Sequence, residues 1–292
     1  MRLPQFEYFA PTTLDEACSL LAKHGKGALA LAGGTDLLVK MKHRRVVPRC
    51  LVNINNIAGL DRIVYEDDKT LSIGALVTIQ TLKASTMVKR QAKLLYQAAA
   101  IQSSIQIRNS ATIGGNIGNA SPAGDGPLAL MVADASVILH GRGGTREVAV
   151  ADLFLAPGKT VLRLGELIEE IRLPPAPPKT GVSYVKHALR RTDIAIVSTA
   201  VTLTVVDGVC ASVRIGLGSV APTIMRARAA EKVLVGQQVD EALVDAAADA
   251  AATEATPIDD IRGTARYRKQ AVRETTRAAV LEALQDARTG GM

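Results

Sequence analysis

Cysteine and aromatic residues are scarce in this chain, and their scarcity excludes several kinds of functional site. The three cysteines, Cys18, Cys50 and Cys210, lie far apart and form no CxxC pair. This spacing argues against an iron–sulfur cluster, a zinc site or a disulfide framework within the chain. Aromatic residues make up 3% of the sequence and tryptophan is absent. The chain therefore lacks the side chains on which single-stranded nucleic acid stacks.

Long apolar runs and clustered histidines are also missing. No stretch approaches the ~18 apolar residues of a membrane-spanning helix, and the amino-terminal MRLPQFEYFAPTT has no apolar signal core. The histidines show neither metal-ligand nor catalytic-triad spacing, and they stand at His24, His43, His140 and His187. We therefore expect a soluble, cytoplasmic chain with no metal site and no catalytic side chain of its own.

The chain has 292 residues, a net charge of +7 and a hydrophobic content of 48%. This length exceeds one minimal domain, and the hydrophobic content allows a sizeable core. Basic clusters at Lys40–Arg45 and Arg262–Lys269 could serve a nucleic acid, an anionic ligand or an acidic partner protein. Nucleic acid is disfavoured, because no helix-turn-helix, zinc-finger or RNA-binding signature accompanies the charge.

Residues 1–57 predict a small parallel α/β domain. A first helix can be capped by Thr12 or Thr13. The apolar run Ala28–Gly33 predicts a buried strand that leads into a glycine turn, and a helix is expected from Leu37 to Lys42. A second buried strand follows at Cys50–Ile54. This strand–turn–helix–strand order is typical of a parallel unit.

Two further domains are predicted after residue 57. Residues 58–176 mix hairpins with helices. The segment Pro174–Gly181, PPAPPKTG, is the clearest linker in the chain. Residues 177–292 predict three antiparallel strands, with a turn at Asp207–Gly208, followed by helices. The expected fold class is therefore α+β.

Two glycine-rich segments carry the chemistry that the sequence offers: LAGGTD at Leu31–Asp36 and TIGGNIGNASPAGD at Thr112–Asp125. A diphosphate needs several hydrogen-bond donors at close range. Backbone N–H groups next to glycine supply them well, because no Cβ blocks the approach. A helix that begins after such a turn adds a partial positive charge.

Both segments could face one diphosphate from opposite sides. Gly33–Gly34 would give one set of N–H donors and Gly114–Gly115 the other. Hydroxyl, amide and carboxylate groups accompany them at Thr35, Thr112, Asn116, Asn119 and Asp125. Neither segment has the GxGxxG or GxxxxGK[ST] spacing. From spacing alone, a simple turn therefore remains as an alternative to an anion site.

The segments AGGTDLLVKMK and ATIGGNIGNASPAGD together resemble the flavin-binding subunit of molybdenum hydroxylases, which include xanthine, carbon monoxide and N-heterocycle dehydrogenases and 4-hydroxybenzoyl-CoA reductase. The resemblance runs from FEYFAPTTLDEA through GELIEEIRLP and Tyr184–Ala200 into the helical tail. It implies a two-subdomain FAD-binding fold of the PCMH (vanillyl-alcohol oxidase-like) type. A carboxy-terminal antiparallel sheet with a helical bundle would complete the chain.

The resemblance also implies where non-covalently bound FAD would lie. One side of the diphosphate would be wrapped by Leu31, Ala32, Gly33, Gly34, Thr35 and Asp36. The other side would be closed by Ala111, Thr112, Gly114, Gly115 and Asn116. Asp125 would hold a sugar hydroxyl, in a loop shaped by Ser121 and Gly124.

Three further positions follow from the same resemblance. Leu173 would lie near the flavin ring or the adenine. Lys186 would approach the flavin pyrimidine edge, where a cation stabilises the reduced ring; a solvated surface lysine is the alternative. For Asp193, a structural role as acceptor for Arg190 or Arg191 is favoured over a flavin contact.

Departures from the family pattern disfavour two branches of the family and covalent attachment of the flavin. Carbon monoxide dehydrogenase flavoproteins tend to carry a tyrosine where this chain has Ile194, which disfavours carbon monoxide as the substrate. Hydroxybenzoyl-CoA reductases carry an iron–sulfur loop in this subunit, which three cysteines cannot supply. Neither glycine segment holds a histidine or cysteine to attach flavin covalently.

The resemblance implies an electron-transfer subunit. It would take electrons from 2Fe-2S clusters of a small partner subunit and pass them through FAD to an external acceptor. A large molybdenum-pterin subunit would oxidise the substrate, in a dimer of heterotrimers. The alternatives are a self-contained FAD oxidase of the vanillyl-alcohol oxidase group and a non-enzymatic anion-binding scaffold. The first is disfavoured by the aromatic-poor carboxy-terminal domain, and the second by the intact glycine segments.

Overall fold

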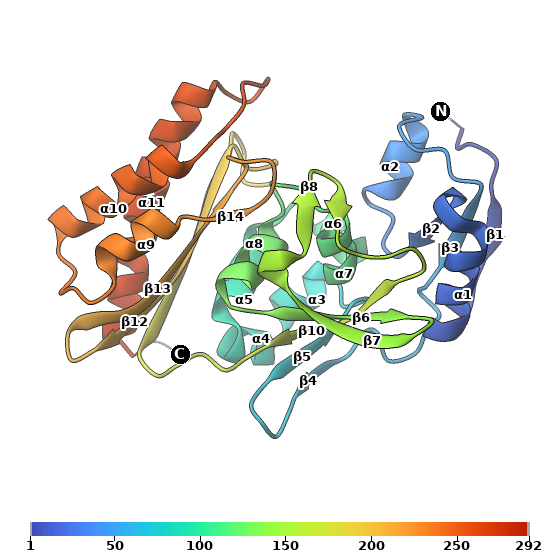
Figure 1. Ribbon diagram of the computed structural model, residues 1–292, viewed down its shortest axis with the longest axis horizontal. Helices are drawn as coiled ribbons and strands as arrows, with labels where there is room; N and C mark the ends of the chain where they lie inside the picture. The colour runs from blue at the N-terminus through green and yellow to red at the C-terminus, as the bar shows by residue number, and fades with distance from the viewer. Residues whose placement is uncertain (1, 291–292) are drawn as a thin grey trace.

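The computed structural model describes residues 2–290, and its main sheets follow one another along the long axis of the molecule in sequence order (Figure 1). The middle sheet lies between the amino-terminal sheet (blue) and the carboxy-terminal sheet (gold), and the carboxy-terminal helices (orange to red) form the end beyond the gold sheet. The sheets fall within the predicted ranges 1–57, 58–176 and 177–292. The expected α+β class is confirmed.

The amino-terminal sheet is parallel, as the sequence predicts, with strand order β1-β3-β2. Its elements are β1 (Glu7–Phe9), α1 (Leu14–His24), β2 (Ala28–Leu31), α2 (Leu37–Lys42) and β3 (Cys50–Asn53). Of the two candidate caps for α1, Thr13 is the one whose side chain accepts from the Glu16 N–H. The strand β1 is an addition to the prediction, because three residues are too few to show alternation.

The middle sheet has the order β4-β5-β10-β6-β7 and is antiparallel throughout. Its strands are β4 (Ile63–Tyr65), β5 (Leu71–Gly74), β6 (Ser136–Gly141), β7 (Gly144–Ala149) and β10 (Leu167–Leu173). Its helices are α3 (Ile79–Ala84), α4 (Thr86–Gln91), α5 (Lys93–Ile101), α6 (Ile105–Ser110), α7 (Ile113–Gly118) and α8 (Asp125–Val132). A two-stranded hairpin, β8 (Phe154–Ala156) with β9 (Lys159–Thr160), completes this part.

The helices α5 and α8 lie between the middle sheet and the carboxy-terminal sheet (Figure 1). Every residue of α8 is buried. Its segment DGPLALMV is apolar on all sides, which is typical of a helix without a solvent-facing surface. This central helix therefore joins the two sheets through one continuous hydrophobic core.

The carboxy-terminal sheet is antiparallel, and its order β11-β12-β13-β14 contains one strand more than the sequence predicts. Its elements are β11 (Thr180–His187), β12 (Val197–Val206), β13 (Val209–Gly218), β14 (Met225–Arg226), α9 (Arg228–Leu234), α10 (Glu241–Glu254) and α11 (Ala265–Arg288). The expected turn at Asp207–Gly208 joins β12 to β13. The helices α10 and α11 cover the face of the sheet that is turned away from α8 (Figure 1).

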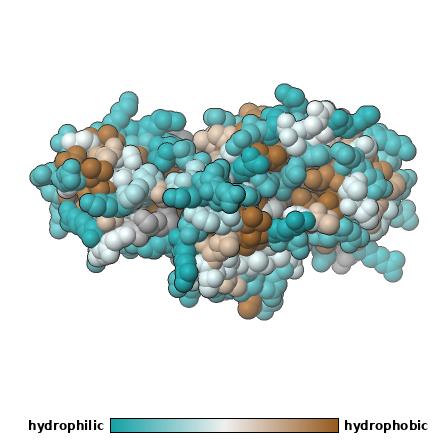
Figure 2. All heavy atoms as spheres, turned by 90° about the horizontal axis from the view of Figure 1, so that it is seen from below, coloured by the Kyte–Doolittle hydropathy of each residue, from teal (hydrophilic) through white to brown (hydrophobic). Residues whose placement is uncertain are grey.

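The outer surface shows no single apolar face on the side that Figure 2 presents. Hydrophilic residues dominate this side, and hydrophobic residues form separate small patches. Within residues 2–290, no helix combines the length and the apolar character needed to cross a membrane.

Candidate functional site

A cavity of about 1070 Å³ lies where the three parts of the chain meet. Its volume is at the upper end of the roughly 300–1,000 Å³ typical of small-molecule sites. All of the predicted cofactor contacts except Leu31 and Leu173 line it: Ala32, Gly33, Gly34, Thr35, Asp36, Ala111, Thr112, Gly114, Gly115, Asn116, Ser121, Gly124, Asp125 and Lys186. The structure thus brings both glycine segments and the carboxy-terminal sheet to one site.

The first glycine segment lines this cavity and has backbone N–H groups without acceptors among residues 2–290. It connects β2 to α2, and Gly34 has a φ of +70° that favours glycine. None of the N–H groups of residues 33–36 donates to an acceptor in the part of the chain that the structure describes. Consecutive N–H groups that point into one space form a concave anion-binding site. This segment therefore fits a diphosphate.

The second glycine segment is built differently from the sequence expectation. It forms α7, with Thr112 as its cap. The Gly114 N–H donates to Ala75 O at 2.9 Å, and the Gly115 N–H donates to Thr112 Oγ1 at 3.1 Å. The expectation that Gly114 and Gly115 supply free donors is therefore not met, because both N–H groups already have acceptors.

Close packing is the structural reason for glycine at two of these positions. A Cβ on Gly33 would lie 1.8 Å from Ser110 O, and a Cβ on Gly114 would lie 2.7 Å from Ala75 O. Both separations are far below van der Waals contact. Gly33 therefore allows the first segment to touch the end of α6, which leads into the second segment, and this contact brings the two sides of the cavity together.

A polar bridge joins the two glycine segments at the cavity. Lys40 Nζ, in α2, donates to Asn119 Oδ1 at 2.6 Å. Asn119 Nδ2 in turn donates to Asp36 Oδ1 at 3.1 Å. All three residues line the cavity. The sequence marks Lys40 only as part of a basic cluster and not as a cofactor contact, although its position one helical turn after Asp36 places it on the same side of α2.

A buried ion pair lines the cavity between Asp125, the first residue of α8, and Lys186 of β11. Lys186 Nζ donates to Asp125 Oδ2 at 2.9 Å, and Tyr184 Oη donates to Asp125 Oδ1 at 2.9 Å. The side chains of Lys186 and Asp125 are 5% and 6% exposed, so Lys186 is not a solvated surface lysine. Tyr184 was not predicted, because β-strand alternation does not mark it as different from a core residue.

Burial governs the titration of the two acidic groups in this cluster. It raises the pKa of the Asp125 carboxyl above its ordinary value, and the Lys186 ammonium and the Tyr184 hydroxyl oppose that rise. Burial, and then the negative charge of Asp125, raise the pKa of Tyr184 well above its ordinary value. The tyrosine hydroxyl therefore stays protonated and remains a donor to Asp125.

Asp193 and Ile194 also line the cavity, on the loop between β11 and β12. The Asp193 N–H donates to Arg190 O at 3.0 Å. Within residues 2–290, the Asp193 carboxylate forms no ion pair, so it is not the acceptor for Arg190 or Arg191 that the sequence suggested. Its side chain is instead part of the cavity wall.

The two predicted contacts outside the cavity have clear structural positions. Leu173 pairs with Leu71 at the far end of β10 and is 3% exposed in the core. The residues of β10 that line the cavity are Leu167 and Ile168. At ~3.3 Å per residue, Leu173 lies about 16 Å further along the strand than Ile168. Leu31 is the last residue of β2, and its side chain lies beside Gly34.

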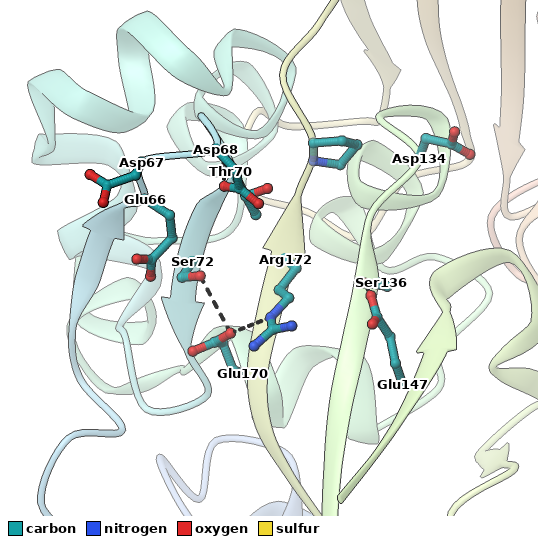
Figure 3. A pocket seen from close by; sticks show the side chains of 11 residues that line it. Glu66, Asp67, Asp68, Thr70, Ser72, Asp134, Ser136, Glu147, Glu170 and Arg172 are labelled. Atoms are coloured by element: carbon teal, nitrogen blue, oxygen red, sulfur yellow. Dashed lines mark hydrogen bonds and ion pairs between the residues drawn. The ribbon is translucent and has the colours of Figure 1, made fainter.

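A second hollow of about 700 Å³ lies on the middle sheet and has a different character (Figure 3). Glu170 accepts hydrogen bonds there from Ser72 Oγ at 3.3 Å and Arg172 Nε at 2.7 Å. The hollow is lined by six carboxylates, at Glu66, Asp67, Asp68, Asp134, Glu147 and Glu170. Like charges at this density repel a phosphate, so the first cavity is the site for an anionic cofactor.

Two family models together cover nearly the whole chain. Residues 4–176 match the FAD binding domain in molybdopterin dehydrogenase. Residues 183–283 match the CO dehydrogenase flavoprotein C-terminal domain. The cavity draws its walls from both matched regions.

Individual relatives match the chain over more than nine tenths of their length. The carbon monoxide dehydrogenase medium chain of Hydrogenophaga pseudoflava is 37% identical, with 91% of this chain and 92% of the relative covered. The nicotine 6-hydroxylase medium subunit of Paenarthrobacter nicotinovorans is 32% identical, with 97% and 99% covered.

Solved structures extend the agreement to three dimensions. A chain of carbon monoxide dehydrogenase from Hydrogenophaga pseudoflava superposes with a TM-score of 0.95 at 37% identity, with 98% and 99% of the chains covered. A chain of quinoline 2-oxidoreductase from Pseudomonas putida 86 gives 0.93 at 30% identity, with 98% and 99% covered. The chain therefore belongs to the family of FAD-binding subunits of molybdopterin dehydrogenases, the molybdenum hydroxylases.

Proposed function

We propose that this chain relays electrons, through FAD held in the cavity of about 1070 Å³, from an iron–sulfur partner to an external acceptor. The free N–H groups of residues 33–36 carry the proposal, because they offer a diphosphate the donors it needs. Bound FAD supplies the redox chemistry, and the chain supplies binding, orientation and electrostatics. No side chain is assigned a covalent or acid–base role.

The contacts that we assign to the cofactor are distributed over all three parts of the chain. The diphosphate lies on Gly33–Asp36. Asn116 lines the cavity, and its side-chain amide oxygen Oδ1 is buried without a partner among residues 2–290, so it can accept from a cofactor hydroxyl or amine. Asp125 retains acceptor capacity for a sugar hydroxyl beside Tyr184. Lys186 would place its positive charge at the flavin pyrimidine edge.

The partners follow from the kind of complex to which the relatives belong. Those named above are medium chains or subunits, so they work beside other chains. We assign a small 2Fe-2S subunit and a large molybdenum-pterin subunit to this chain, in a cytoplasmic dimer of heterotrimers. The organic substrate meets the large subunit. Ile194 lines the cavity, so we assign it to the flavin environment, and we withdraw the expectation that it disfavours carbon monoxide as the substrate.

A visible spectrum tests the function. The protein is purified from its native source through a tag on this chain, together with its partners. We expect flavin absorption, iron and molybdenum in the preparation, and one FAD released per chain by denaturation. A preparation of this chain alone, without iron, molybdenum or flavin and unable to bind micromolar FAD, would show that the proposal is wrong. A flavin-containing chain that oxidises an alcohol without partners would instead favour a self-contained oxidase.

A further inference from the structure

Three cations that line the cavity, Lys26, Lys40 and Arg163, form no ion pair among residues 2–290, and Lys40 is the one that bridges the two glycine segments. Lys40 is partly buried on α2 and lines the cavity, and its ammonium donates to the amide oxygen of Asn119 at 2.6 Å. Within residues 2–290, no carboxylate oxygen lies within ion-pair distance of Lys40 Nζ, whereas Lys186 is paired with Asp125 at 2.9 Å. An ammonium has three donors, so two remain available beside the free N–H groups of residues 33–36.

We infer that Lys40 is the counter-charge for the cofactor diphosphate, and that its bridge to Asn119 and Asp36 latches the two glycine segments over the bound cofactor. This inference rests on the proposed function, since it assigns a residue to the same cavity. It adds a charged group to a diphosphate site that the backbone otherwise supplies alone.

The electrostatics of the first glycine segment call for such a charge. Asp36 ends the segment with an exposed carboxylate that lines the cavity. A diphosphate brings two more negative charges to the same space. The amide of Asn119 holds one oxygen of Asp36 at 3.1 Å, and Lys40 supplies the positive charge on the same side. Charge-assisted hydrogen bonds to phosphate are among the stronger contacts available to a protein.

The bridge can hold the two glycine segments together because its three residues come from two different parts of the chain. Asp36 and Lys40 stand in the amino-terminal part, and Asn119 caps the carboxyl end of α7 in the middle part. The bridge therefore crosses the cavity between segments about 80 residues apart in sequence. A cofactor held between the segments leaves most readily when this bridge opens, so the bridge governs the dissociation rate.

Matched variants separate the charge from the latch. In the complex purified through this chain, FAD is removed and rebound at several salt concentrations, and affinity and dissociation are followed by flavin fluorescence. Lys40→Met is compared with Lys42→Met, which removes the same charge from an exposed position on the same helix outside the cavity. Asn119→Ala opens the bridge and keeps the charge of Lys40.

We expect Lys40→Met to weaken FAD affinity about tenfold or more and to reduce its salt dependence. Asn119→Ala should speed dissociation several-fold with the salt dependence retained, and Lys42→Met should behave as the unaltered protein. Lys40→Gln, which can still bond to Asn119, replaces Lys40→Met if the latter fails to fold. Equal affinity in the Lys40 and Lys42 variants would overturn the inference. Failure of the unaltered complex to rebind FAD would instead overturn the proposed function.

Discussion

Gly114 and Gly118 both belong to α7, but only Gly118 has room for a side chain. Gly114 has no room for a side chain, because a Cβ would lie 2.6 Å from the Cβ of Ala75 and 2.7 Å from its carbonyl oxygen. Gly118, one turn later in α7, has open space, with Ile168 Cδ1 at 3.9 Å as its nearest neighbour. Both line the cavity. Stability measurements can therefore separate packing from cofactor binding.

Substituting each glycine by alanine should move stability in opposite directions. Gly114→Ala forces backbone apart, and we expect a loss of about 1–3 kcal/mol in the free energy of unfolding. Gly118→Ala should gain about 0.5–1 kcal/mol, because alanine restricts the unfolded chain and the helix accepts it. Urea unfolding of the cofactor-free chain, followed by circular dichroism, measures both. Similar unfolding free energies for the two variants would contradict the packing argument.

The buried pair of Asp125 and Lys186 should show strong coupling. Asp125→Asn leaves the Lys186 ammonium buried without a counter-charge, and such a loss costs about 3–5 kcal/mol. Lys186→Met likewise leaves the Asp125 carboxylate buried without a counter-charge. Because the double variant buries no charge, its loss should be smaller than the sum of the single losses by at least about 1 kcal/mol. Additive losses in urea unfolding would mean that the two groups do not interact.

At the scale of elements, one histidine connects α1 to the middle sheet. His140 of β6 contacts Asp15 Oδ1 of α1 through Nε2 at 2.8 Å and Glu169 Oε2 of β10 through Nδ1 at 3.1 Å. The hydrogen bond to Asp15 is the largest cause of a raised His140 pKa, and Glu169 adds to it against the effect of burial. The protonated ring therefore joins α1 to the middle sheet.

This contact should make stability depend on pH in one direction. Because the folded pKa of His140 is raised, its stabilisation is complete below the unfolded value of about 6.5 and is lost as pH rises through the folded value. We expect about 0.5–1 kcal/mol, since Asp15 is exposed. In the unaltered chain, the free energy of unfolding should fall by this amount between pH 6 and pH 9. The fall should be absent in His140→Gln and should persist in His43→Gln, which changes an exposed histidine. Identical pH profiles for His140→Gln and the unaltered chain would contradict this role.

Elements with a clear hydrophobic period were predictable, and those that depend on distant partners were not. The apolar runs at Ala28–Leu31 and Cys50–Asn53 are strands, as the sequence predicts, although in the first of them only Ala28 is fully buried. The helix α7 was missed, because IGGNIG has poor helix propensity and is held by the Thr112 cap and by bonds to Ala75 and Val77. The strand β14 has two residues and exists only through its pairing with β13.

The candidate site shows the same limit at the scale of the whole molecule. Nearly all of the cofactor contacts predicted from the family resemblance line one cavity. It did not reveal that Gly33 packs on Ser110, that Lys40 reaches Asn119 or that Tyr184 supports Asp125. Each of these contacts joins residues about 60 to 80 positions apart in sequence. Only the assembled fold makes such neighbours visible.

Because three parts of the chain line one cavity, an intact dinucleotide should stabilise the molecule more than its halves do. FAD at a hundredfold excess over its dissociation constant adds about 2.7 kcal/mol, which should raise the unfolding midpoint of a 292-residue chain by about 4 °C. FMN and AMP together, each at that concentration, lack the covalent link that makes the second contact intramolecular. We expect them to raise it by less than about 2 °C. Circular dichroism melting of the FAD-depleted complex compares the three conditions. An equal shift from the separate halves would mean that the two ends of the cavity bind independently.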